Sequence, residues 1–170
     1  VRANETLIKI LEDTKQEPMV RHEAAEALGA IGSMEVIELL KKYKKDPIIE
    51  VAETCELALE RIEYFQKNEN RKLVESVYHS VDPAPPCDMD NVNLLKDILL
   101  DDKVSLFKRY TAMFSLRNMG TRDAVLALCE GLKHGSALFR HEIAFVLGQL
   151  QHKDSVPYLT ESLADTTENE

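Results

Sequence analysis

Residues 21–29 read Arg-His-Glu-Ala-Ala-Glu-Ala-Leu-Gly, and residues 140–148 read Arg-His-Glu-Ile-Ala-Phe-Val-Leu-Gly. The two stretches are 119 residues apart, measured from His22 to His141, and they share Arg, His, Glu, Ala, Leu and Gly at matching positions. Apolar residues recur in both at intervals of three and four, which is the period of a helix with one buried face. Helix formers also dominate the rest of the chain, so the sequence predicts an all-α protein.

Weaker copies of this stretch recur at shorter distances. Residues 19–28 align with residues 49–58 at an offset of 30, with an alanine in place of the histidine. In the second half of the chain, the segment that begins at Arg109 aligns with the one that begins at Arg140, at an offset of 31. Periods of this length that hold two helices each are typical of HEAT repeats. We therefore expect HEAT-type (E-Z type) helical hairpins that stack into an α-solenoid with two halves.

The repeat pattern is interrupted at residues 67–90. Residues 67–70 are polar, and residues 81–86 are too rich in proline to be helical. We expect HEAT-type repeats at 1–66 and 91–170 with a linker between them. A connection of this length in a small domain is usually either functional or mobile.

Helix boundaries follow from proline, glycine and capping residues. Pro18 suits the first turn of a helix, because its missing N–H would have no partner there, and that helix should end near Gly32. Ser33 is expected to cap the next helix with its hydroxyl. The expected helices cover residues 4–13, 18–32, a short segment after Ser33, 46–65, 91–101, 104–119, 121–133, 136–150 and 153–164.

Composition limits the classes of partner. The net charge of −9 argues against nucleic acid and anionic membranes and favours a basic partner or substrate. No apolar run reaches the roughly 18 residues that a membrane span needs. The three cysteines, Cys55, Cys87 and Cys129, lie far apart and form no CxxC motif. This spacing argues against a zinc ribbon and favours a reducing compartment, so we expect a cytoplasmic protein.

The His-Glu pair is the unusual feature of the repeated stretch, because ionisable residues are costly to bury on a packing helix. Neighbouring residues on a helix point about 100° apart, so His22 and Glu23 can flank a centre between helices rather than contact each other. With His141 and Glu142, the two helices offer two imidazoles and two carboxylates. Such sets suit non-haem Fe(II) and oxygen chemistry, or a pair of neighbouring metals. The alternative is structural: a repeated polar residue can join one hairpin to the next.

The other repeated residues have structural explanations. Arg21 and Arg140 are expected to pair with a carboxylate of a neighbouring helix. Gly29 and Gly148 are expected to allow close approach of another backbone. Phe145, at helical spacing within an apolar helix, is expected to be part of the core.

A further match concerns the two ends of the chain. Residues 7–14 align with residues 159–166, and the first of these segments is soon followed by a His-Glu helix. By this duplication we expect a parent protein with four His-Glu helices, of which this chain holds two. The apolar faces of its terminal helices would then lack neighbours, so we expect the chain either to self-associate through these ends or to be the ordered middle of a longer protein.

Three segments of the sequence resemble the deoxyhypusine hydroxylase family: residues 19–32, residues 80–86 (Ser-Val-Asp-Pro-Ala-Pro-Pro) and residues 135–142. The resemblance covers nearly the whole chain. It implies a HEAT-repeat enzyme with a non-haem di-iron centre. Such an enzyme uses O₂ to hydroxylate the deoxyhypusine side chain of a translation factor, a step of hypusine biosynthesis.

The resemblance also implies roles for the repeated residues. The family has four His-Glu motifs, and His22 and Glu23 match ligands of one iron. His141 matches a ligand of the other iron, and Glu142 matches a substrate-binding carboxylate. The first and fourth motifs are absent from these 170 residues, so we expect this chain alone to be inactive and poor in metal. The alternative, from a different class, is a HEAT-repeat interaction scaffold without catalysis, resembling the lyase-like repeat proteins that dock bilin carriers.

Overall fold

The computed structural model describes residues 2–68 and 78–167, and in these residues every regular element is helical. The prediction of an all-α protein is confirmed for this part of the chain. The elements are α1 (Arg2–Glu12), α2 (Pro18–Ile31), η1 (Met34–Val36), α3 (Ile37–Tyr43), α4 (Ile49–Lys67), α5 (Val92–Leu100), α6 (Leu106–Met119), α7 (Arg122–Gly131), α8 (Ala137–Leu150), η2 (Lys153–Ser155) and α9 (Val156–Ala164).

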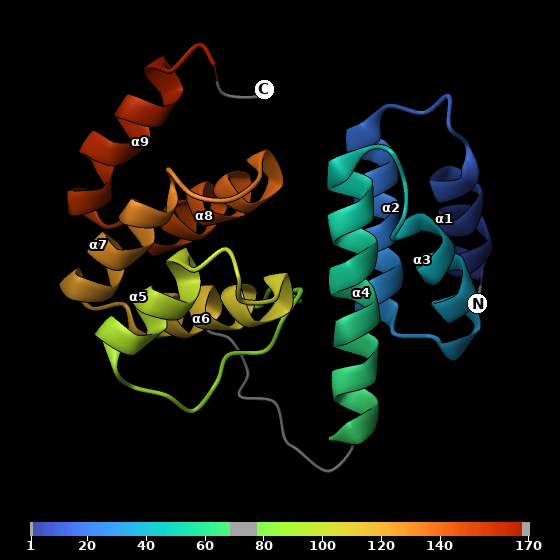
Figure 1. Ribbon diagram of the computed structural model, residues 1–170, viewed down its shortest axis with the longest axis horizontal. Helices are drawn as coiled ribbons and strands as arrows, with labels where there is room; N and C mark the ends of the chain where they lie inside the picture. The colour runs from blue at the N-terminus through green and yellow to red at the C-terminus, as the bar shows by residue number, and fades with distance from the viewer. Residues whose placement is uncertain (1, 69–77, 168–170) are drawn as a thin grey trace. The chain divides into compact units, whose positions relative to one another are not determined.

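The chain forms two compact units. Unit 1 holds α1 to α4 together with residues 81–83, and unit 2 holds residues 78–80 and the described residues from Ala84 onward. Figure 1 labels the helices of both units. The boundaries of the linker at 67–90 stay a prediction, and residues 69–77 of it lie outside the described residues.

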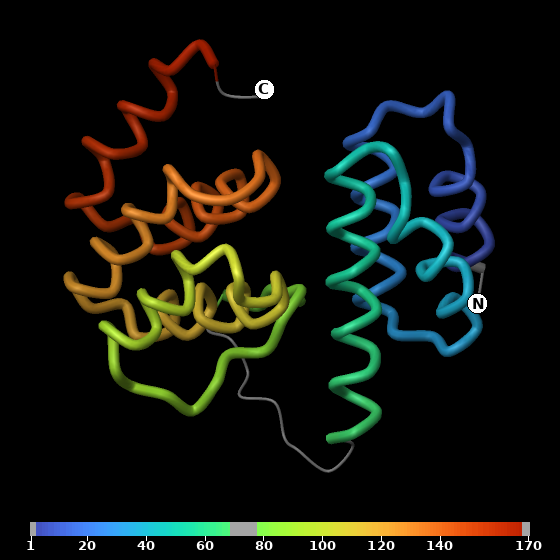
Figure 2. Tube along the Cα trace, viewed as in Figure 1, coloured from blue at the N-terminus to red at the C-terminus, as the bar shows by residue number. Residues whose placement is uncertain are grey.

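In unit 1, α2 packs against both α1 and α4, and α3 also packs against α4. Figures 1 and 2 show α2 and α4 side by side and running in the same direction. The buried core joins all four helices, with Leu11, Leu28, Leu40 and Val51 fully inaccessible to solvent. This parallel pair positions the His22 side chain, because the face of α2 that carries His22 is the face covered by α4.

The ends of α2 follow the sequence. The helix begins at Pro18 and ends at Ile31, and the following C-cap residue, Gly32, has a left-handed φ of 73° that suits glycine. The predicted capping role of Ser33 is wrong, because its side chain makes no capping hydrogen bond. The Ser33 hydroxyl instead accepts a hydrogen bond of 2.9 Å from the buried Asn4 amide of α1.

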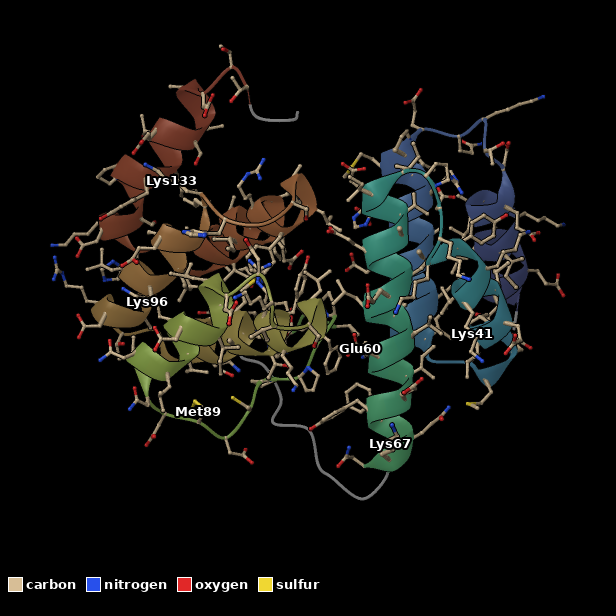
Figure 3. The ribbon with its side chains drawn as sticks, viewed as in Figure 1. Lys41, Glu60, Lys67, Met89, Lys96 and Lys133 are labelled. Atoms are coloured by element: carbon tan, nitrogen blue, oxygen red, sulfur yellow. The ribbon has the colours of Figure 1, made fainter. Side chains whose placement is uncertain are left out.

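Unit 2 is built in two layers. The helices α5 and α7 pack side by side in one layer, α6 and α8 in the other, and each of α5 and α7 also contacts its successor in the chain. Ion pairs join the outer helices: Lys96 of α5 pairs with Glu130 at 2.8 Å, and Lys133 pairs with Glu161 of α9 at 2.6 Å. Figure 3 labels both lysines. The last helix, α9, has no buried residue.

Two arginines hold the described part of the connection between α4 and α5. In unit 1, Arg61 donates to the carbonyl oxygen of Asp82 at 3.1 Å and to that of Gly29 at 2.8 Å. In unit 2, the fully buried Arg117 donates to the Ser80 hydroxyl at 3.3 Å. Within unit 1, Asp82 is therefore bonded to α4, and within unit 2, Ser80 is bonded to α6.

Among the described residues, no helix is both long enough and apolar enough to cross a membrane.

Candidate functional site

The His22 imidazole is buried between α2 and α4. Only 6% of its side chain is exposed. Its Nδ1 lies 2.6 Å from the hydroxyl oxygen of Thr54, and that hydroxyl donates a hydrogen bond of 2.7 Å to the carbonyl oxygen of Glu50 one turn earlier in α4. The Nδ1 atom of His22 is thus hydrogen-bonded to a side chain of α4.

The other ring nitrogen of His22 faces carboxylates. Its Nε2 lies 3.8 Å from Glu23 Oε1 and 3.9 Å from Glu26 Oε2. The Glu23 side chain is 72% exposed, whereas that of Glu26 is 35% exposed. Burial raises the pKa of Glu26 above its ordinary value, and the negative charges of Glu23 and Asp82 raise it further. A cation beside Nε2 would relieve this crowding of negative charge.

An imidazole nitrogen beside two carboxylates is the donor chemistry that iron and other first-row metals accept. The described residues nevertheless hold no group of three or more His, Cys, Asp or Glu side chains placed to bind a metal ion. Unit 1 therefore supplies donors of the right kind but a partial ligand set.

His141 and Glu142 lie early in α8 of unit 2. His141 is exposed and Glu142 is half-buried. His141 shares one stripe of the helix with Phe145 and Gly148, at spacings of four and three residues. The prediction that Phe145 belongs to the core is wrong, because 53% of it is exposed. The whole stripe is open, whereas α4 covers the corresponding stripe of α2.

The two repeated glycines differ in the space around them, because α4 covers the stripe of α2 that contains Gly29, whereas the stripe of α8 that contains Gly148 is open. A methyl group added at Gly29 would lie 2.6 Å from the Cβ and 2.9 Å from the Cα of Ala58 in α4. The predicted close approach is therefore confirmed for Gly29. It is wrong for Gly148, where an added methyl group would meet no atom within 4 Å.

Arg21 has the predicted structural role. Its guanidinium donates to both carboxylate oxygens of Asp46, at 3.3 and 2.5 Å, and its Nε donates to the Leu11 carbonyl oxygen at 3.0 Å. Burial raises the pKa of Asp46, but hydrogen bonds from Arg21 and from the Ile48 N–H, together with the charge of Arg21, lower this pKa by more.

The closest structural counterpart of Arg21 in unit 2 is Arg109 rather than Arg140. The Nε of Arg109 donates to the Leu99 carbonyl oxygen at 2.9 Å, again ten positions earlier in the chain, and its Nη1 pairs with Asp102 at 2.9 Å. Arg140 donates to the Gly135 carbonyl oxygen at 2.7 Å. Hydrogen bonds from the hydroxyl and the N–H of Thr167 lower the pKa of Asp165 after α9, and the charge of Arg140 adds to this lowering.

Two residues of the His22 environment were missed in the sequence. Glu26 could have been found, because it lies four residues after His22 and so on the same face of the helix. Thr54 carried no such signal, because it lies on another helix and its counterpart in the repeated stretch is the apolar Ala24. His22 and His141 belong to different units, so their convergence on one cavity with Glu23 and Glu142 stays a prediction.

Comparison with known proteins adds to this description. The family of HEAT repeats matches residues 2–60 and 92–170. The chain is 57% identical to human deoxyhypusine hydroxylase over 168 residues and 59% identical to the deoxyhypusine hydroxylase of Drosophila pseudoobscura pseudoobscura over 169 residues, in both cases over 99% of the chain. A solved structure of human deoxyhypusine hydroxylase in complex with glycerol matches with a TM-score of 0.94 at 57% identity.

These matches cover unequal shares of the two proteins. The chain spans 55% of the human sequence and 56% of the Drosophila pseudoobscura pseudoobscura one, and it covers 58% of the solved human chain.

Proposed function

The chain belongs to the HEAT-repeat family, and on this premise we propose that it acts within a deoxyhypusine hydroxylase, an O₂-dependent monooxygenase of hypusine biosynthesis. The observation that carries the proposal is the identity of 57% and 59% to two deoxyhypusine hydroxylases across 99% of this chain. The buried His22, with Nε2 directed at two carboxylates, supports it.

Under this proposal His22 and Glu23 bind one iron of a di-iron centre, and His141 binds the other. Iron, when bound, supplies the chemistry that activates O₂ for hydroxylation of the substrate carbon. The half-buried Glu142 binds the cationic deoxyhypusine side chain of a translation factor, and the net charge of −9 favours the approach of a basic protein surface. The exposed stripe around His141 leaves that helix face accessible to such a partner.

The ligand count leads us to propose that these 170 residues alone are inactive. Metal affinity depends on the number of ligands and on how well they are preformed, and unit 1 supplies a partial set. The relatives are nearly twice as long, and their remaining length has room for the two further His-Glu motifs that the resemblance implies. We also propose a cytoplasmic location, from the three separated cysteines, and self-association of the chain when the neighbours of its terminal helices are missing.

The test is iron per chain together with hydroxylation of a deoxyhypusine-containing protein. Both are measured for the 170-residue chain and for a protein of the relatives' full length that contains it. In the longer protein, His22→Ala and His141→Ala should each lower iron content. Glu142→Ala should weaken substrate binding and leave iron largely in place, and equal iron loss in that variant would refute the division of roles.

The 170-residue chain tests whether these residues are active alone. We expect little iron and no turnover from it. Two tightly held irons per isolated monomer, with turnover, would show that the four-motif arrangement is wrong. A full-length protein that binds neither iron nor substrate would instead support a non-catalytic HEAT-repeat scaffold.

A further inference from the structure

Thr54 makes two contacts that together determine where the proton of His22 resides. Its Oγ1 lies 2.7 Å from the Glu50 carbonyl oxygen and 2.6 Å from His22 Nδ1. A carbonyl oxygen can only accept, so the single hydroxyl hydrogen of Thr54 is the donor in the first contact. This bond to the carbonyl four residues earlier is a common arrangement for threonine in a helix.

The same hydrogen cannot serve the imidazole as well. The lone pairs of Oγ1 remain, and they accept, so the proton in the second contact belongs to Nδ1 of His22. In a neutral imidazole one nitrogen is the donor and the other the acceptor. A proton on Nδ1 therefore leaves Nε2 as the electron-pair donor, directed toward the carboxylates of Glu23 and Glu26 at 3.8 and 3.9 Å.

We propose that Thr54 is a positioning residue: its hydroxyl oxygen holds the proton of His22 on Nδ1 and so presents Nε2 to a metal ion. A histidine that binds metal through one nitrogen commonly donates its other N–H to a fixed acceptor, which sets both the tautomer and the ring orientation. The tautomer is inferred from the hydrogen bonds of unit 1 alone. The inference that Nε2 binds a metal ion rests on the proposed function.

The packing of α4 keeps this acceptor in reach. Gly29 lies seven residues after His22, and because it has no Cβ, the backbone of α2 can lie directly against the Cβ of Ala58 in α4. Arg61 of α4 also donates a hydrogen bond of 2.8 Å to the Gly29 carbonyl oxygen. These two contacts hold α2 and α4 close together on the C-terminal side of His22 and Thr54. Thr54, four residues before Ala58, is held at the height of His22.

The competing arrangement turns the Thr54 hydroxyl toward Nδ1. The Glu50 carbonyl would then lose its side-chain donor, and the neutral ring would carry its proton on Nε2, where it blocks metal binding. The two arrangements predict opposite tautomers, so a measurement of the tautomer decides between them.

Nuclear magnetic resonance of the metal-free chain with ¹⁵N-labelled histidine distinguishes the two ring nitrogens, at a pH where the ring holds one proton. The spectrum of His22→Gln identifies the His22 signals by their absence. We expect the Nδ1–H form in the wild type and in Thr54→Ser, which keeps the hydroxyl. In Thr54→Val, which keeps the shape, the Nε2–H form should gain population. Thr160→Val is the matched control, because Thr160 makes the same bond to a carbonyl four residues earlier without a histidine partner.

Zinc(II), added to the same variants made in a protein of the relatives' full length, tests the consequence for metal, because the 170-residue chain alone holds a partial ligand set. Shifts of the His22 signals report binding, and we expect Thr54→Val to weaken it about 10- to 100-fold, with Thr54→Ser close to the wild type. An Nε2–H tautomer in the wild type, or a tautomer unchanged in Thr54→Val, overturns the role of Thr54. If the tautomers follow expectation while zinc moves no His22 signal in any variant, the role of Thr54 in setting the tautomer stands and the metal role of His22 is refuted.

Discussion

Adding one methyl group at each of the two repeated glycines should have opposite effects on stability. At Gly29 the new Cβ would lie 2.6 Å from the Cβ and 2.9 Å from the Cα of Ala58, so α2 and α4 must move apart. Overpacking of this kind costs about 1–3 kcal/mol, and backbone movement places it in the upper part of that range. Alanine regains about 1 kcal/mol over glycine inside a helix. The net expectation for Gly29→Ala is a loss of about 1–2 kcal/mol.

At Gly148 the same methyl group meets no atom within 4 Å, so only the helix preference remains. Gly148→Ala should therefore be more stable than the wild type by about 0.5–1 kcal/mol. The two variants would then differ by roughly 1.5–3 kcal/mol. For a chain of this size, each kcal/mol corresponds to about 2–4 °C in melting temperature.

Urea unfolding followed by circular dichroism measures both variants, and hydrogen exchange locates the change. Faster exchange in Gly29→Ala should be concentrated in α2 and α4. The double variant with Ala58→Gly removes the Cβ–Cβ clash, so its loss should be smaller than the sum of the single losses. If Gly29→Ala unfolds at the wild-type urea concentration, or if Gly148→Ala is equally destabilised, the structural distinction between the two glycines is refuted.

Further predictions concern the buried charges and the cysteines. Arg21→Ala should cost about 3–5 kcal/mol in urea unfolding, because it leaves the carboxylate of Asp46 buried without its cation; a loss below 1 kcal/mol would contradict this. Because the pKa of Asp46 is lowered in the folded chain, the contribution of Asp46 to stability is present above its ordinary pKa of 3.8 and is lost as the pH falls through the lower folded value. In a pH series of urea unfolding experiments, Asp46→Asn should therefore lack this acid-dependent loss of stability. Arg117→Ala should speed hydrogen exchange in residues 78–87, and unchanged protection there would show that Arg117 does not hold the segment. Burial raises the pKa of the Cys55 thiol to about 12, so it should resist thiol reagents at neutral pH until the chain unfolds; rapid labelling of the native chain would contradict its burial.

The helices themselves were predictable because their signals are local. Pro18 and Gly32 mark the ends of α2, since one lacks an N–H and the other adopts a left-handed conformation without steric cost. The failures come from partners that are distant in sequence. The Ser33 hydroxyl bonds Asn4 of α1 instead of capping the following turn, and nothing near Ser33 indicates this.

The candidate site shows the same division. The repeated frame identified His22 and His141, but the positions that the two copies share cannot reveal which copy has a neighbouring helix over it. The stripe of α2 is covered by α4, whereas the stripe of α8 that contains Phe145 is open. Thr54 reaches His22 only through the packing of two helices, so its role required coordinates.

The bonds that Arg21 and Arg109 make to the carbonyl oxygens of Leu11 and Leu99 have a consequence for how these repeats tolerate mutation. Every residue type has a backbone carbonyl, so no substitution at position 11 or 99 can remove the acceptor. Each hydrogen bond between a helix and its predecessor therefore requires a particular residue type at one position, that of the arginine, instead of at two. The partner position is free to vary with the packing around it, and only the arginine must be kept for the link to persist through sequence drift.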